Sequence, residues 1–374
     1  MPVVSFMPYF PDVGVDKTYG NFRIWNWWKH REEIITDPKV RAYLDNYFSL
    51  YTRATGEQET RIAILSQVGR ALIPEENEFA PAELARFAKA VMMCYLFNFP
   101  RDPQAGWAAC SSDNFMAVSQ PFDPTMVSAT PTFVYGSYVK TQVTGTWDAL
   151  RFTTPQYMPN PSFCDCEEDL LARLAALCSE KDEAIERLFL SFDWVKLAFA
   201  NYDELQYPAR IVSMSAAFEI LLDFPANAGK GKFFAWIMNR LIPPNRLPLS
   251  THPWGRRQTP VEDNEVGWWC RRFYDLRSRA VHGTGLERKD LFHASGVEHL
   301  RIALSIFEEG LRGLLIQRGR MKEEERRARF LSAPLGAKSS DCPKTAGTRR
   351  NPRNPKSSGV EGEWAKPAFF VGFS

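Results

Sequence analysis

The sequence predicts an α+β protein, in which a mixed α/β N-terminal domain precedes an all-α helical bundle. Short apolar runs interrupted by prolines occupy residues 1–162, whereas long segments with apolar residues at helical spacing follow. The composition is that of an ordinary globular protein, with 45% hydrophobic and 24% charged residues. A chain of 374 residues has room for about two domains.

The N-terminal domain, residues 1–162, is predicted to contain strands and one clear helix. The runs that predict strands are 60–66, 115–119 and 133–143, the last with Gly136 as a bulge. Pro81 suits the first position of a helix, and apolar residues then repeat at helical spacing at Leu84, Phe87, Val91 and Cys94. Prolines at 155, 159 and 161 mark the predicted end of this domain.

The helical bundle is predicted for residues 163–320. Amphipathic periodicity and capping residues predict six helices, joined mostly by short connections: Asp165 or Glu167 to about Cys178, Asp182 to Phe199, Pro208 to Asp223, Lys232 to Leu241, Asn264 to His282, and Gly296 to Arg318. Residues 321–374 form a basic tail, and its Ser-, Pro- and Gly-rich part, residues 333–366, is expected to be disordered.

Charge and cysteine content argue against a protein that is basic over its whole surface and against a zinc site. Net charge is +2, and residues 333–374 contribute seven Lys/Arg against three Asp/Glu, which leaves −2 for residues 1–332. Nucleic-acid affinity of the folded part would therefore need a local basic patch. Of the seven cysteines, Cys164, Cys166 and Cys178 lie near one another, but their spacing is unlike a zinc site and no histidine is close. We expect reduced thiols, no metal and no cofactor.

The N-terminus and the apolar segments predict a cytoplasmic protein without a membrane span. The first residues lack the basic start of a signal peptide and are interrupted by prolines. The longest apolar run, Phe87 to Phe97, is too short to cross a bilayer and contains Lys89.

The most informative stretch of the chain is Tyr274 to Gly283. It places Arg277 and His282 five positions apart, and such a pair suits metal-independent phosphodiester chemistry. The spacing alone is weak evidence, because similar pairs occur four times: Arg23/His30, Arg246/His252, Arg277/His282 and Arg288/His293. Only Arg277/His282 lies within one periodic segment that ends on a helix-stop glycine.

The segment Phe273 to Gly283 resembles the signature of HEPN domains, specifically the ApeA-like branch, in which a tyrosine-containing helix leads into Arg-Ser…His-Gly. A second match is Arg210 to Leu222, and the resemblance covers residues 165–320. It implies a helical bundle that commonly dimerises and a metal-independent RNase of bacterial antiviral defence. Arg277 and His282 then take the catalytic positions, and Ser278 takes a polar position where many HEPN nucleases have Asn, Asp or His.

Helix geometry shapes the expected site. Arg277 and His282 are about 140° apart on an ideal helix, whereas Ser278 and His282 share a face. Gly283 permits the helix to end there, so His282 would lie in the last turn, where the helix dipole favours an imidazolium. In the expected reaction His282 transfers the proton and Arg277 holds the phosphate of an RNA substrate.

Further groups are expected to support the catalytic pair. Glu219, on the facing helix, would orient Arg277 or His282, and Tyr274 is a further supporting residue. Because one histidine cannot easily be both acid and base, a homodimer would supply a second Arg/His pair.

Alternative interpretations remain open at this point. Arg277/His282 can be a surface arginine beside a helix-end histidine, in a HEPN-like bundle that binds a partner protein or nucleotide without catalysis. Trp25, Trp27 and Trp28 can be core residues, the favoured interpretation, or a platform for stacking bases. The Lys230-Gly231-Lys232 segment lacks Walker spacing and is interpreted as a loop.

Two hypotheses concern the parts outside the bundle. The N-terminal domain would detect an invader-derived trigger or restrain the nuclease. A basic tail over residues 333–374 would instead suit a DNA-binding regulator.

Overall fold

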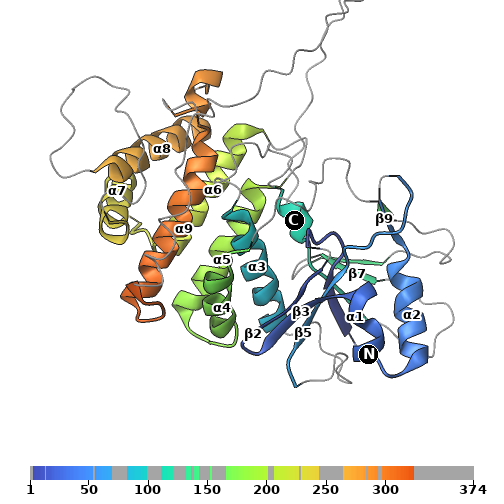
Figure 1. Cartoon of the computed structure of the whole chain (residues 1–374). Helices are drawn as coiled ribbons and strands as arrows, with labels where there is room; N and C mark the ends of the chain where they lie inside the picture. Colours follow the sequence, from blue (N-terminus) through green and yellow to red (C-terminus); the bar gives the residue numbers. More distant parts are fainter. Residues whose placement is uncertain are drawn as a thin grey trace, which may run out of the picture. The chain divides into compact units, whose positions relative to one another are not determined.

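The computed structural model of the chain (Figure 1) describes residues 3–12, 14–53, 55–69, 82–98, 111–121, 132–135, 139–142, 152–153, 166–200, 206–226, 229–243, 264–283, 285–293 and 297–323. All of them belong to one compact unit, Met1–Leu335. A β-sheet from the first part of the chain combines with helices that follow it, which confirms the predicted α+β class. The expected boundary near residue 162 and the expected disordered tail lie outside the described residues.

The described strands form an antiparallel sheet of seven in the order β2-β3-β5-β1-β6-β7-β8. Their bounds are β1 Val3–Met7, β2 Asp16–Tyr19, β3 Phe22–Asn26, β5 Ala63–Gln67, β6 Val118–Pro121, β7 Thr132–Tyr135 and β8 Val139–Gln142. In the register, Ser5 pairs with Leu65 and Trp25 pairs with Ile64. A second, parallel pair joins β4 (Tyr51–Thr52) to β9 (Phe152–Thr153).

Both faces of the central strands are buried, and alternation along each strand divides their side chains between two cores. Phe22 and Ile24 of β3 pack into the core that includes α3 (Ala82–Leu96), while Trp25 packs into the core beneath α1 (Trp27–Ile34) and α2 (Pro38–Phe48). Asn26 caps α1 by accepting a hydrogen bond from the Lys29 amide.

Trp25 in β3 and Trp27, the first residue of α1, are packing residues. Trp25 and Trp27 are fully buried, and the Trp27 indole donates to Asp45 at 2.8 Å. This burial confirms that Trp25 and Trp27 belong to the core, and it removes them as a platform for stacking bases. Trp28 is half-buried; it packs against the same core, and its indole donates to the Glu59 carbonyl at 2.9 Å.

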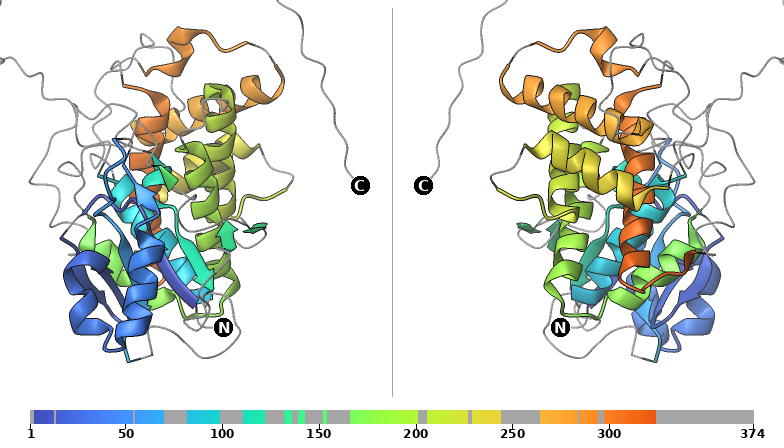
Figure 2. Two further views of the ribbon diagram at one scale, coloured as in Figure 1. Left: turned by 90° about the vertical axis from the view of Figure 1, so that its right-hand side faces the viewer. Right: turned by 90° about the vertical axis from the view of Figure 1, so that its left-hand side faces the viewer.

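Helix α3 joins the sheet to the helical part. Its buried residues belong to the same core as those of the helices that follow, so the apolar interior continues from sheet to bundle. Those helices are α4 (Glu168–Leu177), α5 (Glu183–Ala198), α6 (Tyr207–Leu221), α7 (Lys230–Leu241), α8 (Glu265–Val281) and α9 (His299–Gln317), with short 3-10 helices η3 (Ser112–Phe115) and η6 (Arg288–Leu291). Helix α5 packs along α6, α7 packs along α8, and α9 contacts α6 and α7 (Figure 2).

Small residues and a buried ion cluster hold α9 in place. A Cβ on Gly313 would lie 2.5 Å from the Leu241 carbonyl oxygen, so only glycine permits this approach of α9 to α7. Arg312 donates to Glu167 at 2.6 Å and to Glu308 at 3.0 Å, and all three side chains are at most 3% exposed. This cluster ties α9 to the start of α4.

Three expectations about local structure were wrong. The run 133–143 contains two strands, β7 and β8, which pair antiparallel with Tyr135 opposite Val139. Apolar and polar residues alternate in the same way along one long strand and along the two strands of a hairpin, so the alternation does not show where the chain reverses direction. Of the run 115–119, Phe115 lies in η3 and β6 begins at Val118. The Lys230-Gly231-Lys232 segment is the first turn of α7, capped by Gly229, rather than a loop.

The predicted helices agree with the observed ones to within a few residues. Strands β1 to β3 and helices α1 and α2 were not predicted. Within the described part of the chain, no helix combines the length and apolar composition needed to cross a membrane.

Candidate functional site

Helix α8 carries the Arg/His segment, and its ends are well defined. Asn264 caps its start by accepting from the Gly267 amide at 3.0 Å. Its apolar stripe, Val266, Trp269, Phe273 and Leu276, is buried against the bundle. The helix ends at Val281, His282 is the C-cap residue, and Gly283 follows with φ +69°. The helix therefore ends as the glycine predicts, because a left-handed residue stops the helical hydrogen bonding.

Glu219 of α6 is the centre of a polar cluster that draws on three helices. Its Oε1 accepts from the Tyr274 hydroxyl of α8 at 3.0 Å, and its Oε2 accepts from Lys230 Nζ of α7 at 2.6 Å. Arg277 Nη2 lies 3.7 Å from Oε1. The structure thus brings together Glu219, Tyr274 and Arg277, and it adds Lys230, a residue that the sequence-based expectations did not include. We call these four residues the Glu219 cluster.

Within the Glu219 cluster, burial and charge keep the Tyr274 hydroxyl protonated. Partial burial, and then the Glu219 carboxylate, raise the pKa of Tyr274 to about 12, so this hydroxyl stays a proton donor at neutral pH. The Arg277 guanidinium lies over the Tyr274 ring, with Cζ 5.4 Å from its centroid. Two cations therefore share one carboxylate, and the cluster keeps a net positive charge that suits a phosphate.

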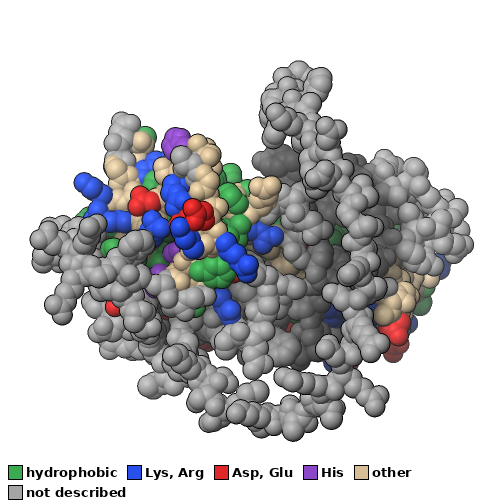
Figure 3. Space-filling view, turned by 90° about the horizontal axis from the view of Figure 1, so that it is seen from above, with side chains coloured by type: hydrophobic (Ala, Val, Ile, Leu, Met, Phe, Trp, Pro, Cys, Tyr) green, Lys and Arg blue, Asp and Glu red, His purple; other side chains and the backbone are tan. Residues whose placement is uncertain are grey.

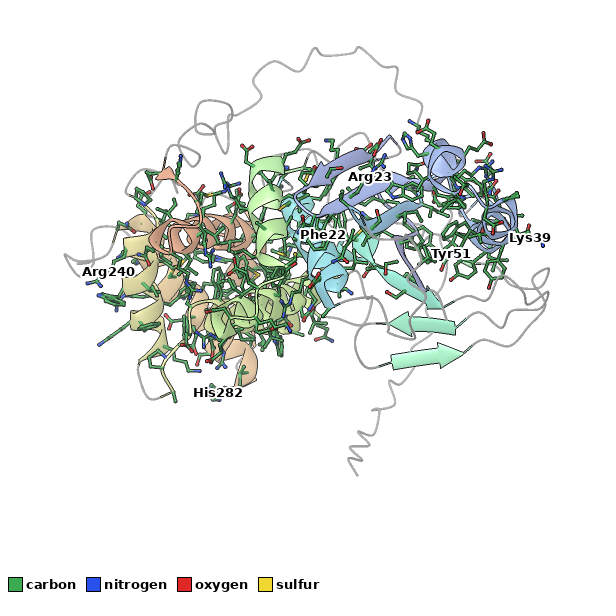
Figure 4. All side chains as sticks on the ribbon, turned by 90° about the horizontal axis from the view of Figure 1, so that it is seen from below. Phe22, Arg23, Lys39, Tyr51, Arg240 and His282 are labelled. Carbon is green, nitrogen blue, oxygen red and sulfur yellow. The ribbon has the colours of Figure 1, made fainter. Side chains whose placement is uncertain are left out.

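His282 is exposed at the end of α8, and Figure 4 labels it at the outer edge of the helical part. Its backbone N–H donates to the Ser278 carbonyl at 3.0 Å, while Ser278 itself is half-buried. Among the described residues, no hydrogen bond joins Arg277 to His282. One protomer consequently presents an accessible imidazole and, five residues earlier, an arginine beside Glu219.

The chain that follows His282 is anchored by Asp290. This carboxylate accepts from Arg279 at 2.7 Å and from the Glu287 amide at 3.0 Å, and Arg272 lies 3.5 Å away. The hydrogen bond from Arg279 is the main reason that the pKa of Asp290 falls to about 2. Arg272 and Arg279 are therefore structural cations, whereas Arg277 belongs to the Glu219 cluster.

The other Arg/His pairs differ from Arg277/His282. Arg23 donates to Asp16 at 2.8 Å, and His30 Nδ1 lies 4.0 Å from the same carboxylate, so Asp16 connects this pair. His293 is buried, and burial lowers its pKa. Arg246 and His252 lie outside the described residues.

The second stretch of the resemblance, Arg210 to Leu222, forms most of α6. Arg210 lies near its start, where burial lowers its pKa and its charge interacts with Asp113 and Glu298. Glu219 lies near its end. The two charged residues of this stretch thus occupy different environments, and only Glu219 joins the Glu219 cluster.

No group of three His, Cys, Asp or Glu side chains close enough to hold a metal occurs among the described residues. Cys178 is buried, and burial raises the pKa of its thiol to about 12. Cys166 is half-buried, and Cys164 lies outside the described residues.

Basic side chains gather on one face of the helical part, with a few acidic side chains between them (Figure 3). Comparisons of the chain with models of protein families, with curated proteins and with solved structures found no match. Function therefore has to be inferred from the residues of the site.

Proposed function

We propose that the protein is a HEPN-type, metal-independent endoribonuclease of bacterial antiviral defence, in which Arg277 and His282 act on RNA. The observation that carries the proposal is the arrangement at the end of α8. The Arg277 guanidinium lies 3.7 Å from the Glu219 carboxylate, and the imidazole of His282 is exposed at the C-cap five residues later. Such an arginine suits phosphate binding, and such a histidine suits proton transfer.

In the proposed reaction the RNA 2′-hydroxyl gives its proton to the imidazole of one His282, and its oxygen attacks the adjacent phosphorus. A new P–O bond forms as the bond to the 5′-oxygen breaks, and that oxygen takes up a proton from the imidazole of the second subunit's His282 as it leaves. Arg277 stabilises the charge that grows on the non-bridging phosphate oxygens. Tyr274 and Lys230 hold Glu219, and Glu219 limits the directions in which the Arg277 guanidinium can point.

A homodimer completes this proposal, because one histidine does not readily supply both proton transfers. In a two-fold contact each subunit presents the same surface, so two exposed His282 side chains would face one cleft. The same proposal assigns the N-terminal sheet a regulatory role, with an invader-derived trigger, and places the protein in the cytoplasm.

The test compares parent and His282→Ala proteins on defined transfer and messenger RNAs in the presence of a chelator. General acid–base catalysis typically contributes about 10²–10⁴-fold, so we expect cleavage to fall by at least about 100-fold. His30→Ala is the matched control, because it removes the histidine of a similarly spaced Arg/His pair and should leave cleavage unchanged. Equal cleavage by parent and His282→Ala proteins contradicts the proposal.

A second candidate is a HEPN-like bundle that binds a partner protein or nucleotide without catalysis. It is favoured by one observation: among the described residues no hydrogen bond joins Arg277 to His282, so one protomer does not by itself assemble the two side chains as a catalytic pair. This candidate predicts that purified parent protein leaves every RNA intact, and that Arg277→Ala alters binding while His282→Ala does not. A DNA-binding regulator, in contrast, would lose function on deletion of residues 333–374 and keep it in His282→Ala.

A further inference from the structure

Aromatic side chains form a continuous run from the outer side of α7 to α8. Trp236 is 48% exposed, and the Arg240 guanidinium lies over its ring at 3.9 Å from the centroid. Phe233 lies 5.7 Å from Trp236, and Phe224 lies 5.1 Å from Phe233, centroid to centroid. Figure 4 shows Arg240 on the outer side of the helical part.

The run continues to the Glu219 cluster. The Phe224 ring lies 6.4 Å from the Tyr274 ring, over which Arg277 is placed. We call the side chains of Trp236, Phe233, Phe224 and Tyr274 the aromatic strip. It begins at one arginine, Arg240, and ends at another, Arg277, five residues before His282.

Core packing accounts for only part of the aromatic strip. The face of α7 that packs inward carries Phe234, Ala235, Met238 and Leu241, all buried. Trp236 lies on the opposite face, where an indole half exposed to water gains little from burial. Phe233, Phe224 and Tyr274 are half-buried, and Phe224 also packs against the core.

The charge around the aromatic strip is positive. Helix α7 contains Lys230, Lys232 and Arg240 and no acidic residue. Of the four arginines of α8, Arg277 lies over the Tyr274 ring of the strip, whereas Arg272 and Arg279 pair with Asp290. Flat rings flanked by arginines suit a ligand that combines exposed π-faces with a negative backbone.

We propose that the aromatic strip binds single-stranded RNA, with bases stacked on Trp236 and its neighbours and phosphates contacting Arg240 and Arg277. The inference rests on the proposed ribonuclease function, because the strip leads the strand towards His282. A single strand is favoured over a duplex, since paired bases hide their faces within the stack. A second copy of the chain is disfavoured, because a two-fold contact would bring the basic α7 surfaces together.

The test measures binding in the His282→Ala background, so that cleavage does not interfere. Fluorescence anisotropy gives the Kd for a labelled single-stranded 12-nucleotide RNA and for a duplex of the same length. Adding Trp236→Ala should raise the Kd for the single strand about tenfold, the equivalent of about 1.4 kcal/mol. Trp236→Phe should have nearly the same Kd as the protein with Trp236, because it keeps an aromatic ring. Trp236→Leu should have a Kd like that of Trp236→Ala.

Two more variants separate charge from general surface effects. Arg240→Gln should weaken binding and lower the slope of log Kd against log salt by about one. Leu190→Ala in α5 is the matched control, because it removes an apolar side chain that is 49% exposed elsewhere on the bundle. It should leave the Kd unchanged.

Several outcomes overturn the proposal. One is an unchanged Kd for the single strand in Trp236→Ala, and another is a Trp236→Leu protein that binds as tightly as the parent. A third is a Trp236→Ala protein that loses as much affinity for the duplex as for the single strand. A change of oligomeric state in Trp236→Ala, seen by light scattering, would instead make the strip a contact between copies. If the strip variants bind RNA as the parent does but His282→Ala no longer cleaves it, the strip proposal fails and the ribonuclease proposal stands. Cleavage unaffected by His282→Ala overturns that function whatever the strip binds.

Discussion

Acid should destabilise this protein through one buried histidine, His299. Its side chain is 3% exposed, and its Nδ1 accepts a hydrogen bond from the Trp269 indole at 3.1 Å. The neighbouring ring of His293 lies 6.1 Å away, centroid to centroid. Burial first, and then the charges of His293 and Arg272, lower the pKa of His299 from 6.5 to about 3, although Asp290 acts in the opposite direction.

The size of the effect follows from proton linkage. Between pH 6.5 and pH 3 the unfolded chain carries a proton on His299 that the folded protein does not, so stability falls as the pH falls through this window. Each pH unit well inside the window costs about 1.4 kcal/mol. Lowering the pH from about 7 to about 5 should therefore remove about 2 kcal/mol of unfolding free energy through this residue alone.

Urea denaturation at pH 7, 6 and 5, followed by circular dichroism, measures this loss. His299→Gln keeps an acceptor for the Trp269 indole but cannot be protonated, so its stability should fall less with acid than that of the parent. His293, whose pKa is also lowered, accounts for part of the remaining slope. The reasoning is refuted if His299→Gln and the parent lose the same free energy between pH 7 and pH 5.

Two carboxylate clusters give further predictions. Glu219→Gln should reduce RNA cleavage by about tenfold, because Arg277 loses the anion that orients it. The free energy of unfolding should fall by only about 1–2 kcal/mol. Unchanged cleavage would show that Glu219 does not belong to the site. Arg312→Leu should cost about 3–5 kcal/mol in the same denaturation experiment, because Glu167 and Glu308 are left buried without their cation. Replacing all three side chains with leucine should recover much of that loss, and a triple variant as unstable as Arg312→Leu would contradict this account.

Local signals were sufficient for the helices of the C-terminal half. Asp182 and Asn264 cap α5 and α8 where the sequence predicts, and the apolar periodicity of each helix matches its buried face. The helix end at His282 was also predictable, because Gly283 readily adopts a positive φ. These features depend on residues within one or two turns of one another.

The first strands and helices escaped prediction for a physical reason. The central strands are buried on both faces, so β1 reads as an almost continuous apolar run, without the polar alternation that marks a half-exposed strand. Helix α1 begins within a tryptophan-rich segment whose side chains are divided between capping, sheet packing and helix packing. Sequence periodicity over so few residues does not distinguish these roles.

By itself the sequence determined where α8 begins and ends, which of its faces is apolar, and that Arg277 and His282 lie near its C-terminus. Only the tertiary structure decided their surroundings. Glu219, Lys230 and Arg277 come from three helices, and the packing of α6, α7 and α8 places both cations beside one carboxylate. The same packing joins Arg240 to Arg277 through rings of α7, of α8 and of the segment that follows α6. Contacts between residues far apart in the chain depend on how helices pack, which local sequence patterns do not encode.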